Sequence, residues 1–198
     1  MWNDRYDTPD YLFGTEPADF MRAHESHLKP GLKGLAVADG EGRNSVFMAQ
    51  RGVETLAMDM SSNALQKAKA LAADRAVTVA HVEASVTDWR WEPAAFDLVV
   101  AVFIQFLSPD ARDAVFAGMV ETLRPGGVLM LHGYRPEQLS YGTGGPGIEE
   151  NLYTEALLRQ SFQTLEILAL ESYDKDIDEG AGHSGMSALI DLVARRPA

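Results

Sequence analysis

The chain has 198 residues and no cysteine, and its 46% hydrophobic and 23% charged residues are ordinary values for one globular domain, here 1–198. Its net charge of −12 argues against nucleic acid as the main partner, because phosphate contacts need clustered lysine and arginine. No apolar run reaches the length of a membrane span and the N-terminus lacks a signal-peptide pattern, so we expect a cytoplasmic protein without membrane contacts.

Residues 1–16 are rich in aromatic and polar side chains and show no helical or strand periodicity. They precede an expected helix that Thr15 would cap and that Pro30 and Gly31 would end. Two interpretations of this first segment stay open: it packs on a sheet, or it closes over a site.

The next stretch has the pattern of strand, glycine turn, helix and strand. The apolar runs Leu35–Ala38 and Val53–Met58 predict two parallel strands, and the loop after the first strand contains Gly40 and Gly42. Glycine has no Cβ, so backbone N–H groups there could approach a ligand closely. Asp59 follows the second strand at the edge where such sheets bind ligands, and its carboxylate could accept hydrogen bonds from a ribose.

The same alternation of strands and helices continues along the chain. The expected elements are a helix beginning at Ser61, a strand over Val77–Val82, a buried strand over Phe96–Ile104, a helix beginning at Ser108 and a strand over Val128–Leu131. Residues 135–150 form a long glycine-rich connection, which we expect to be part of a mobile cover over the acceptor pocket, with Leu139 and Tyr141 as apolar anchors that dock on a filled site. The alternative, a flexible connection without a role, stays open.

The last third of the chain has a different order. A short helix is expected over Thr154–Phe162, followed by strands over Leu165–Leu170 and Ala188–Ala194 with an acidic loop between them. Two strands joined without a helix imply an antiparallel pair at the edge of the sheet.

This order, together with the stretches WNDRYDTPDYLFGTEP, DGEGRN, LRPGGVLML and GYRPEQLSYGTGGP, resembles the class I S-adenosylmethionine-dependent methyltransferases. More specifically, these four stretches resemble the small bacterial tellurite-resistance-type and thiopurine-methyltransferase-like proteins. The resemblance implies an α/β fold: a Rossmann-like seven-stranded, mostly parallel sheet with an antiparallel last strand and helices on both faces. It also implies methyl transfer from S-adenosylmethionine to a small-molecule acceptor such as a thiol or a chalcogen oxyanion, with S-adenosylhomocysteine as the product.

The resemblance also assigns residues to the cofactor. Ala36 and Ala38 stand where the family has an acid and a glycine, so that Asp39 or Glu41 would have to replace the acid. The expected cofactor-binding residues are Ala38, Asp39, Gly40, Gly42, Arg43, Asp59, Met60, Ser85, Val86 and Phe103.

Methyl transfer from a sulfonium needs orientation and exclusion of water, and a base only where the acceptor must lose a proton. His132 and His183 are the candidate bases, and Tyr6 could orient an acceptor. Arg43 could bind an anionic substrate or pair with a surface acid. No cluster of histidine and acids has metal-ligand spacing, so no metal is expected.

Two other functions stay open. Gly40-x-Gly42-x-x-Ser45 followed by Asp59 also resembles the fingerprint of an NAD-dependent oxidoreductase. The changes at Ala36 and Ala38 also fit a non-catalytic regulatory domain that binds S-adenosylmethionine. The sequence leaves the identity of the acceptor and the oligomeric state open.

Overall fold

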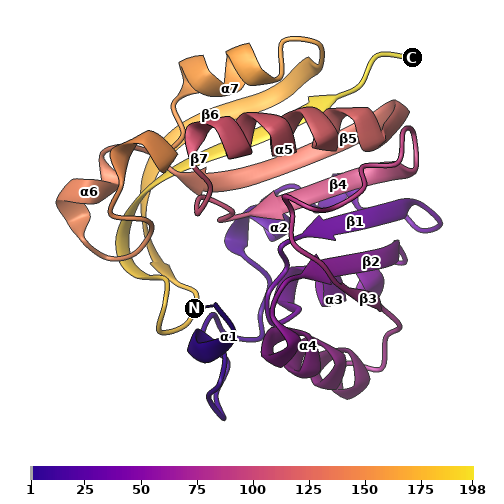
Figure 1. Ribbon diagram of the computed structural model, residues 1–198, viewed down its shortest axis with the longest axis vertical. Coiled ribbons are helices and arrows are strands. Elements are labelled where there is room, and N and C mark those ends of the chain that lie inside the picture. Colours follow the sequence, from indigo (N-terminus) through magenta and orange to yellow (C-terminus); the bar gives the residue numbers. More distant parts are fainter. Residues whose placement is uncertain (1) are drawn as a thin grey trace.

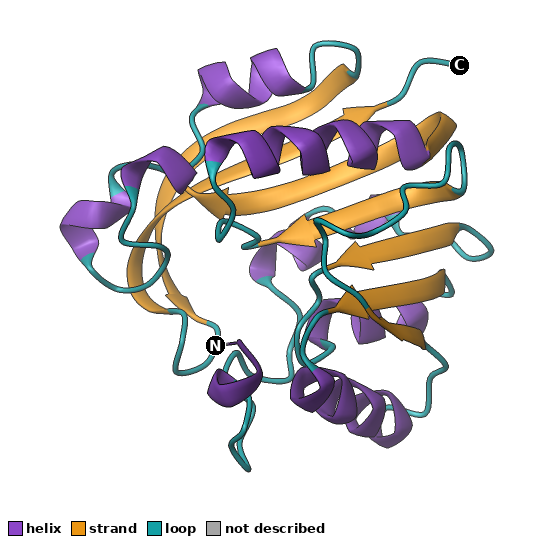
Figure 2. Cartoon of the chain, in the orientation of Figure 1, coloured by secondary structure: helices purple, strands orange, loops and turns teal. Residues whose placement is uncertain are grey.

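The computed structural model describes residues 2–198 and contains a seven-stranded sheet with helices on both faces (Figures 1 and 2). The strand order is β3-β2-β1-β4-β5-β7-β6. The first five strands are parallel, and β7 is antiparallel to both of its neighbours, β5 and β6. The expected fold class is therefore confirmed, including the reversed last strand.

The strands are β1 Lys33–Val37, β2 Glu54–Asp59, β3 Ala80–Glu83, β4 Phe96–Val102, β5 Leu123–Tyr134, β6 Glu166–Asp178 and β7 Ser184–Arg195. The helices are α1 Trp2–Arg5, α2 Asp19–Ala23, α3 Arg43–Gln50, α4 Ser62–Asp74, α5 Pro109–Thr122, α6 Gln138–Tyr141 and α7 Glu155–Ser161. Two 3-10 turns are η1 Glu25–His27 and η2 Glu149–Asn151. Within residues 2–198, no helix combines the length and apolar character needed to cross a membrane.

Successive side chains of a strand point to opposite sides of the sheet. Helices cover both sides here, so both faces of the central strands are buried. On one face, Val99 of β4 belongs to a core that includes Phe116 of α5 and Phe162, the C-cap of α7. On the other face, Val100 packs with Phe47 of α3 and with residues of α2. This double burial explains why β4 is a continuous apolar run in the sequence.

The N-terminal region differs from the expectation. Instead of one helix capped by Thr15, the structure has the short α1, then α2 and η1. Ala18 is the N-cap of α2 and makes no side-chain cap bond; its backbone N–H donates to Oδ1 of Asn44 at 3.0 Å. The start of α2 is therefore fixed by a tertiary contact to α3, which local sequence does not reveal.

The last two strands are much longer than expected. Beyond Leu189, where β7 stops pairing with β5, β6 and β7 continue toward the hairpin tip as a two-stranded ribbon. The ribbon's acidic and glycine-rich sequence resembles a loop, which is why the sequence did not predict it. Its tip, residues 179–183, lies beside the N-terminal segment, and the Gly182 N–H donates to the carbonyl oxygen of Leu12 at 3.1 Å.

The glycine-rich connection 135–150 is partly helical, with α6 and η2 in it. Leu139 and Tyr141 are exposed, at 45% and 37%, so their docking on a filled site stays a prediction. The connection is held by the Tyr141 hydroxyl, which donates to Oδ2 of Asp174 in β6 at 3.0 Å, and by Gln138, which accepts a 2.8 Å hydrogen bond from the backbone N–H of Ala188 in β7.

Candidate functional site

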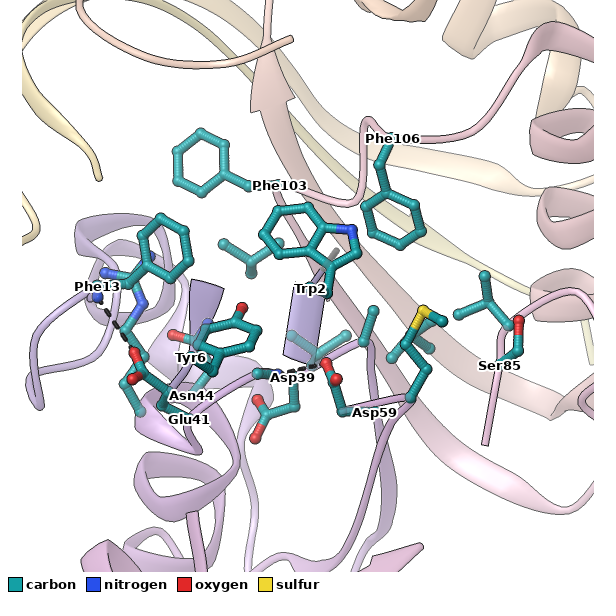
Figure 3. Close-up of a pocket in the computed structure, with 18 of the residues that line it drawn as sticks. Trp2, Tyr6, Phe13, Asp39, Glu41, Asn44, Asp59, Ser85, Phe103 and Phe106 are labelled. Carbon is teal, nitrogen blue, oxygen red and sulfur yellow. Dashed lines mark hydrogen bonds between the residues drawn. The ribbon is translucent and has the colours of Figure 1, made fainter. Parts of the chain in front are cut away.

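A cavity of about 230 Å³ lies at the carboxyl ends of β1, β2 and β4, the edge where open α/β sheets bind ligands (Figure 3). Its walls come from the N-terminal segment, the glycine loop after β1, the ends of β2 and β4, the loop after β3 and the tip of the β6–β7 hairpin. The lining residues are Trp2, Tyr6, Phe13, Gly14, Val37–Glu41, Arg43, Asn44, Asp59, Met60, Ala84–Thr87, Val100, Val102, Phe103, Phe106, Leu107 and His183.

The glycine loop places backbone groups at the floor of this cavity. Ala38 and Gly40 both have positive φ, +48° and +63°, which turns the chain sharply between β1 and α3. Ala38 takes this left-handed conformation at the position where class I methyltransferases usually have a glycine. The conformation costs a residue with a Cβ about 1 to 2 kcal/mol. A Cβ at Gly40 would lie 2.9 Å from the hydroxyl oxygen of Tyr6, so this position has no room for a side chain.

Gly42 has a different role from the one expected. It does not line the cavity; it is the left-handed N-cap of α3, with φ of +93°. A Cβ there would lie 2.8 Å from Cα and Cβ of Ala68 in α4. The structure thus gives Gly42 a packing role, since it lets α3 and α4 approach closely, and it does not support close approach of Gly42 to the ligand.

Asp59 lies at the end of β2 with its carboxylate at the cavity (Figure 3). Oδ2 accepts from the Gly40 N–H at 2.9 Å, and Oδ1 accepts from the Ser61 N–H at 2.8 Å. Burial raises the pKa of this carboxyl group, and the backbone N–H groups oppose that rise. A carboxylate has about four acceptor sites, so Asp59 keeps capacity for a ribose hydroxyl.

Two acids of the glycine loop were candidates to replace the acid missing at Ala36. Glu41 already binds Nζ of Lys67 at 2.8 Å and the Phe13 N–H at 3.3 Å. In Asp39, Oδ1 accepts from the Ser45 N–H, whereas Oδ2 is buried without a hydrogen-bond partner. Burial raises the pKa of Asp39 to about 7. Asp39 is therefore the better candidate to meet a positively charged group.

Met60 and Val86 line the side of the cavity next to Ser85. Met60 is 55% exposed, whereas Val86 is buried. Ser85 and Thr87 share a hydrogen bond between their hydroxyl oxygens at 2.8 Å. All three expected residues of this side, Met60, Ser85 and Val86, are brought together here.

Aromatic rings form the opposite side. The ring centroids of Phe103 and His183 are 4.2 Å apart, and those of Phe13 and His183 are 4.5 Å apart. Tyr6 is buried against Phe13, and burial raises the pKa of its hydroxyl above the ordinary value. The expected residues Tyr6, Phe103 and His183 thus line the cavity together.

His132 does not line the cavity. It is 2% exposed, its ring stacks on Phe20 at 5.0 Å, and Nδ1 lies 2.6 Å from Oδ1 of Asp191. The Tyr173 hydroxyl donates to the same carboxylate. The ring of Phe103 separates this buried group from the ligand space, with ring centroids 4.6 Å apart. The structure therefore does not support direct contact of His132 with a ligand.

Arg43 lines the cavity, and its partner is not a surface acid. Its Nη1 lies 2.8 Å from Oε2 of Glu179, and each side chain is only 7% exposed. Sequence reasoning missed Glu179, and it also missed Trp2, Phe13 and Phe106 as lining residues. The one available signal was the density of aromatic residues in the first 13 positions.

Comparison with known proteins agrees with this geometry. Residues 35–127 match a family model described as a methyltransferase domain. An uncharacterized methyltransferase of Synechocystis sp. is 29% identical over 105 residues, which are 52% of this chain and 48% of the relative. An uncharacterized protein of Mycobacterium tuberculosis is 30% identical over 102 residues, 52% of this chain and 37% of the relative. The chain thus spans less than half the length of these curated relatives.

Solved structures of low identity share the whole fold. TehB from Haemophilus influenzae has a TM-score of 0.71 at 16% identity, over 98% of this chain and 65% of that chain. The N-methyltransferase NodS from Bradyrhizobium japonicum has a TM-score of 0.69 at 15% identity, over 91% and 98%. Magnesium protoporphyrin IX methyltransferase from Synechocystis was solved with bound S-adenosylhomocysteine. It has a TM-score of 0.66 at 16% identity, over 88% of this chain and 78% of that chain.

The fold is that of the class I S-adenosylmethionine-dependent methyltransferases. The family match and these neighbours support S-adenosylmethionine as the cofactor, and they do not favour a nicotinamide dehydrogenase or a regulatory domain.

Proposed function

We propose that this chain transfers a methyl group from S-adenosylmethionine to a small-molecule acceptor. The observation that carries the proposal is the carboxylate of Asp59 at the end of β2, fixed by the Gly40 N–H at the floor of the cavity; both residues lie in the matched range 35–127. In sheets of this kind an acid at that place binds the ribose of a nucleotide.

The residues present fit this cofactor. Asp59 would bind the ribose, and Met60 and Val86 would hold the adenine between them. The methionine end would lie over the turn at Gly40, where a side chain would collide with Tyr6. The unpartnered Oδ2 of Asp39 supports this acid as the partner of the ammonium group, in place of the acid missing at Ala36.

S-adenosylmethionine, when bound, supplies a methyl group on a sulfonium: the S–CH₃ bond breaks with its electron pair on sulfur, and the acceptor forms the new bond. The protein's part is orientation and exclusion of water. Trp2 stacks with Tyr6 at 5.9 Å and meets Phe106 edge-on at 5.9 Å, so aromatic rings cover the cavity. Tyr6 and His183 would face the acceptor.

We also propose that the protein belongs with the small tellurite-resistance-type methyltransferases. The aromatic N-terminal segment and the run from Asp39 to Asn44 support this, as does the shared fold of TehB over nearly the whole chain. The likeness to TehB is one of fold, so the acceptor has to be argued from this cavity.

The test is calorimetric binding of S-adenosylmethionine, followed by detection of S-adenosylhomocysteine with a panel of thiol, amine, hydroxyl and oxyanion acceptors. Micromolar binding with product on at least one acceptor would support the proposal. Tight binding without turnover on the whole panel would favour a regulatory role, and absence of binding would reject both.

A further inference from the structure

The chemistry of the cavity's aromatic end restricts the acceptor. Figure 3 shows Phe13 and Phe103 on the side of the cavity opposite Ser85, where the adenine would lie. The rings of Phe103 and His183 meet at 89°, and those of Phe13 and His183 at 69°. The three rings are in edge-to-face contact and present one continuous aromatic wall to the cavity, and a planar molecule can pack on such a wall because aromatic pairs prefer offset or edge-to-face contact.

The positive charge at this end is already matched. Among the lining residues of the described chain, Arg43 is the one side chain with a permanent positive charge, and Glu179 holds it at 2.8 Å. The other oxygen of Glu179 accepts from the Asp19 N–H at 3.0 Å, so this acid is fixed in place. The remaining charged groups of the lining are the carboxylates of Asp39, Glu41 and Asp59.

His183 adds a neutral hydrogen-bonding group. Burial, and after it the charge of Arg43, lowers the pKa of its imidazole to about 3. Its Nδ1 is buried without a hydrogen-bond partner. A neutral imidazole offers one donor and one acceptor nitrogen, so His183 can accept a hydrogen bond from an uncharged group.

We propose that the acceptor is an uncharged, planar small molecule whose nucleophilic atom carries a hydrogen, seated against the aromatic wall of Phe13, Phe103 and His183 with that hydrogen directed at His183. This inference rests on the methyl transfer proposed above. The bond from sulfur to the methyl carbon breaks with its electron pair on sulfur, the bond from the acceptor atom to that carbon forms, and the acceptor's proton passes to His183 and from there to water when the products leave.

The same arrangement disfavours oxyanions such as tellurite and selenite. An anion here would lose its hydration beside the carboxylates of the lining, and Arg43, the permanently charged cation among the described lining residues, would have to leave Glu179 to meet it. The net charge of −12 also opposes the approach of anions.

The test uses two probes that differ by one charge, benzyl mercaptan and 4-(mercaptomethyl)benzoate, with sodium selenite as a third. The full-length protein is first shown to bind S-adenosylhomocysteine, and the affinity of each probe for that complex is then measured by calorimetry. We expect the neutral thiol to bind about tenfold more tightly than its carboxylate analogue, as expected when a buried charge lacks a partner. Selenite should bind more weakly than both.

The variant Glu179→Gln keeps the side chain's shape and its acceptor oxygen for Asp19, but it leaves the charge of Arg43 unmatched. It should narrow or reverse the preference for the neutral probe. The matched control is Asp178→Asn, which removes the same charge from the exposed neighbouring position and should leave the preference as it is.

The outcomes separate the two proposals. Loss of S-adenosylhomocysteine binding in the wild type would reject the proposed function itself. Normal cofactor binding with equal or tighter binding of the carboxylate analogue or selenite, or with none of the probes bound, would overturn the inference on the acceptor alone. If Glu179→Gln does not fold, the comparison of the three probes on the wild type still decides.

Discussion

The backbone N–H of Gly40 donates a 2.9 Å hydrogen bond to Oδ2 of Asp59, so the glycine loop after β1 and the end of β2 hold each other in place. Both residues line the cavity. The acid therefore has two tasks: it fixes the turn on which a methionine end would rest, and it presents its free acceptor sites to a ribose.

The first prediction concerns this acid. Asp59→Asn should keep the fold and weaken S-adenosylmethionine binding by about 1 to 3 kcal/mol, the range for hydrogen bonds that involve a charged group. Calorimetry gives the affinity, and Glu54→Gln, at the exposed far end of the same strand, is the control. Unchanged affinity in Asp59→Asn would remove the ribose assignment.

The second prediction separates the two glycines of the loop. Gly42→Ala should lower the free energy of unfolding by about 2 kcal/mol or more, because its positive φ and the contact with Ala68 both oppose a side chain. Gly40→Ala should mainly weaken the binding of the cofactor, because the added Cβ would meet the Tyr6 hydroxyl inside the cavity. Urea unfolding and calorimetry on both variants give the two quantities. A larger loss of affinity than of stability in Gly42→Ala would contradict the packing role.

The part of the site formed by β1, the glycine loop and Asp59 could be predicted from sequence because its signals are local. The apolar run of β1, Gly40 and Asp59 lie within 25 residues, and each has a position-specific physical reason. The capping of α4 is similarly local: Ser61 accepts a hydrogen bond from the Ala64 N–H, as its position before the helix indicates.

The part of the site formed by the N-terminal segment and the β6–β7 hairpin could not be predicted, because it depends on contacts between segments that are distant in sequence. Glu179 meets Arg43 across 136 positions of sequence, and no periodicity links them. A side chain at Gly182 would collide with the ring of Phe13, because an added Cβ would lie only 2.3 Å from that ring. The pairing of His132 with Asp191 likewise comes from the register of β5 and β7.

The third prediction is a dependence of stability on pH. Burial raises the pKa of Asp39 to about 7 in the folded protein, from an ordinary value of 3.8. The folded state therefore holds this proton more tightly than the unfolded state does. As the pH rises from 3.8 to about 7, the contribution of Asp39 to the free energy of unfolding falls. His183, whose folded pKa is lowered to about 3, acts in the opposite direction between pH 3 and 6.5. Only a variant therefore isolates the contribution of Asp39.

Asp39→Asn removes this contribution, so its stability relative to the wild type should increase from pH 4 to pH 7 by up to about 4 kcal/mol, from a shift of about three pKa units. Urea unfolding of both proteins without ligand gives this difference. A constant difference across that range would show that Asp39 ionises as an ordinary acid.

The last prediction concerns the N-terminal segment as the cover of the cavity. Oδ1 of Asn3 accepts hydrogen bonds from the Ser61 hydroxyl at 2.9 Å and from the Asn63 N–H at 3.1 Å, which fixes Trp2 over the cavity beside the start of α4. Asn3→Ala should loosen this cover and lower the cofactor affinity by about 1 kcal/mol, the usual net contribution of such hydrogen bonds.

The change should appear mainly as faster dissociation, because the cover hinders the ligand's exit while Asp59 and Gly40 still bind it. Stopped-flow displacement of S-adenosylhomocysteine measures that rate, with Asp7→Asn, at an exposed position of the same segment, as the control. Equal dissociation rates in Asn3→Ala and the wild type would show that the N-terminal segment does not retain the cofactor.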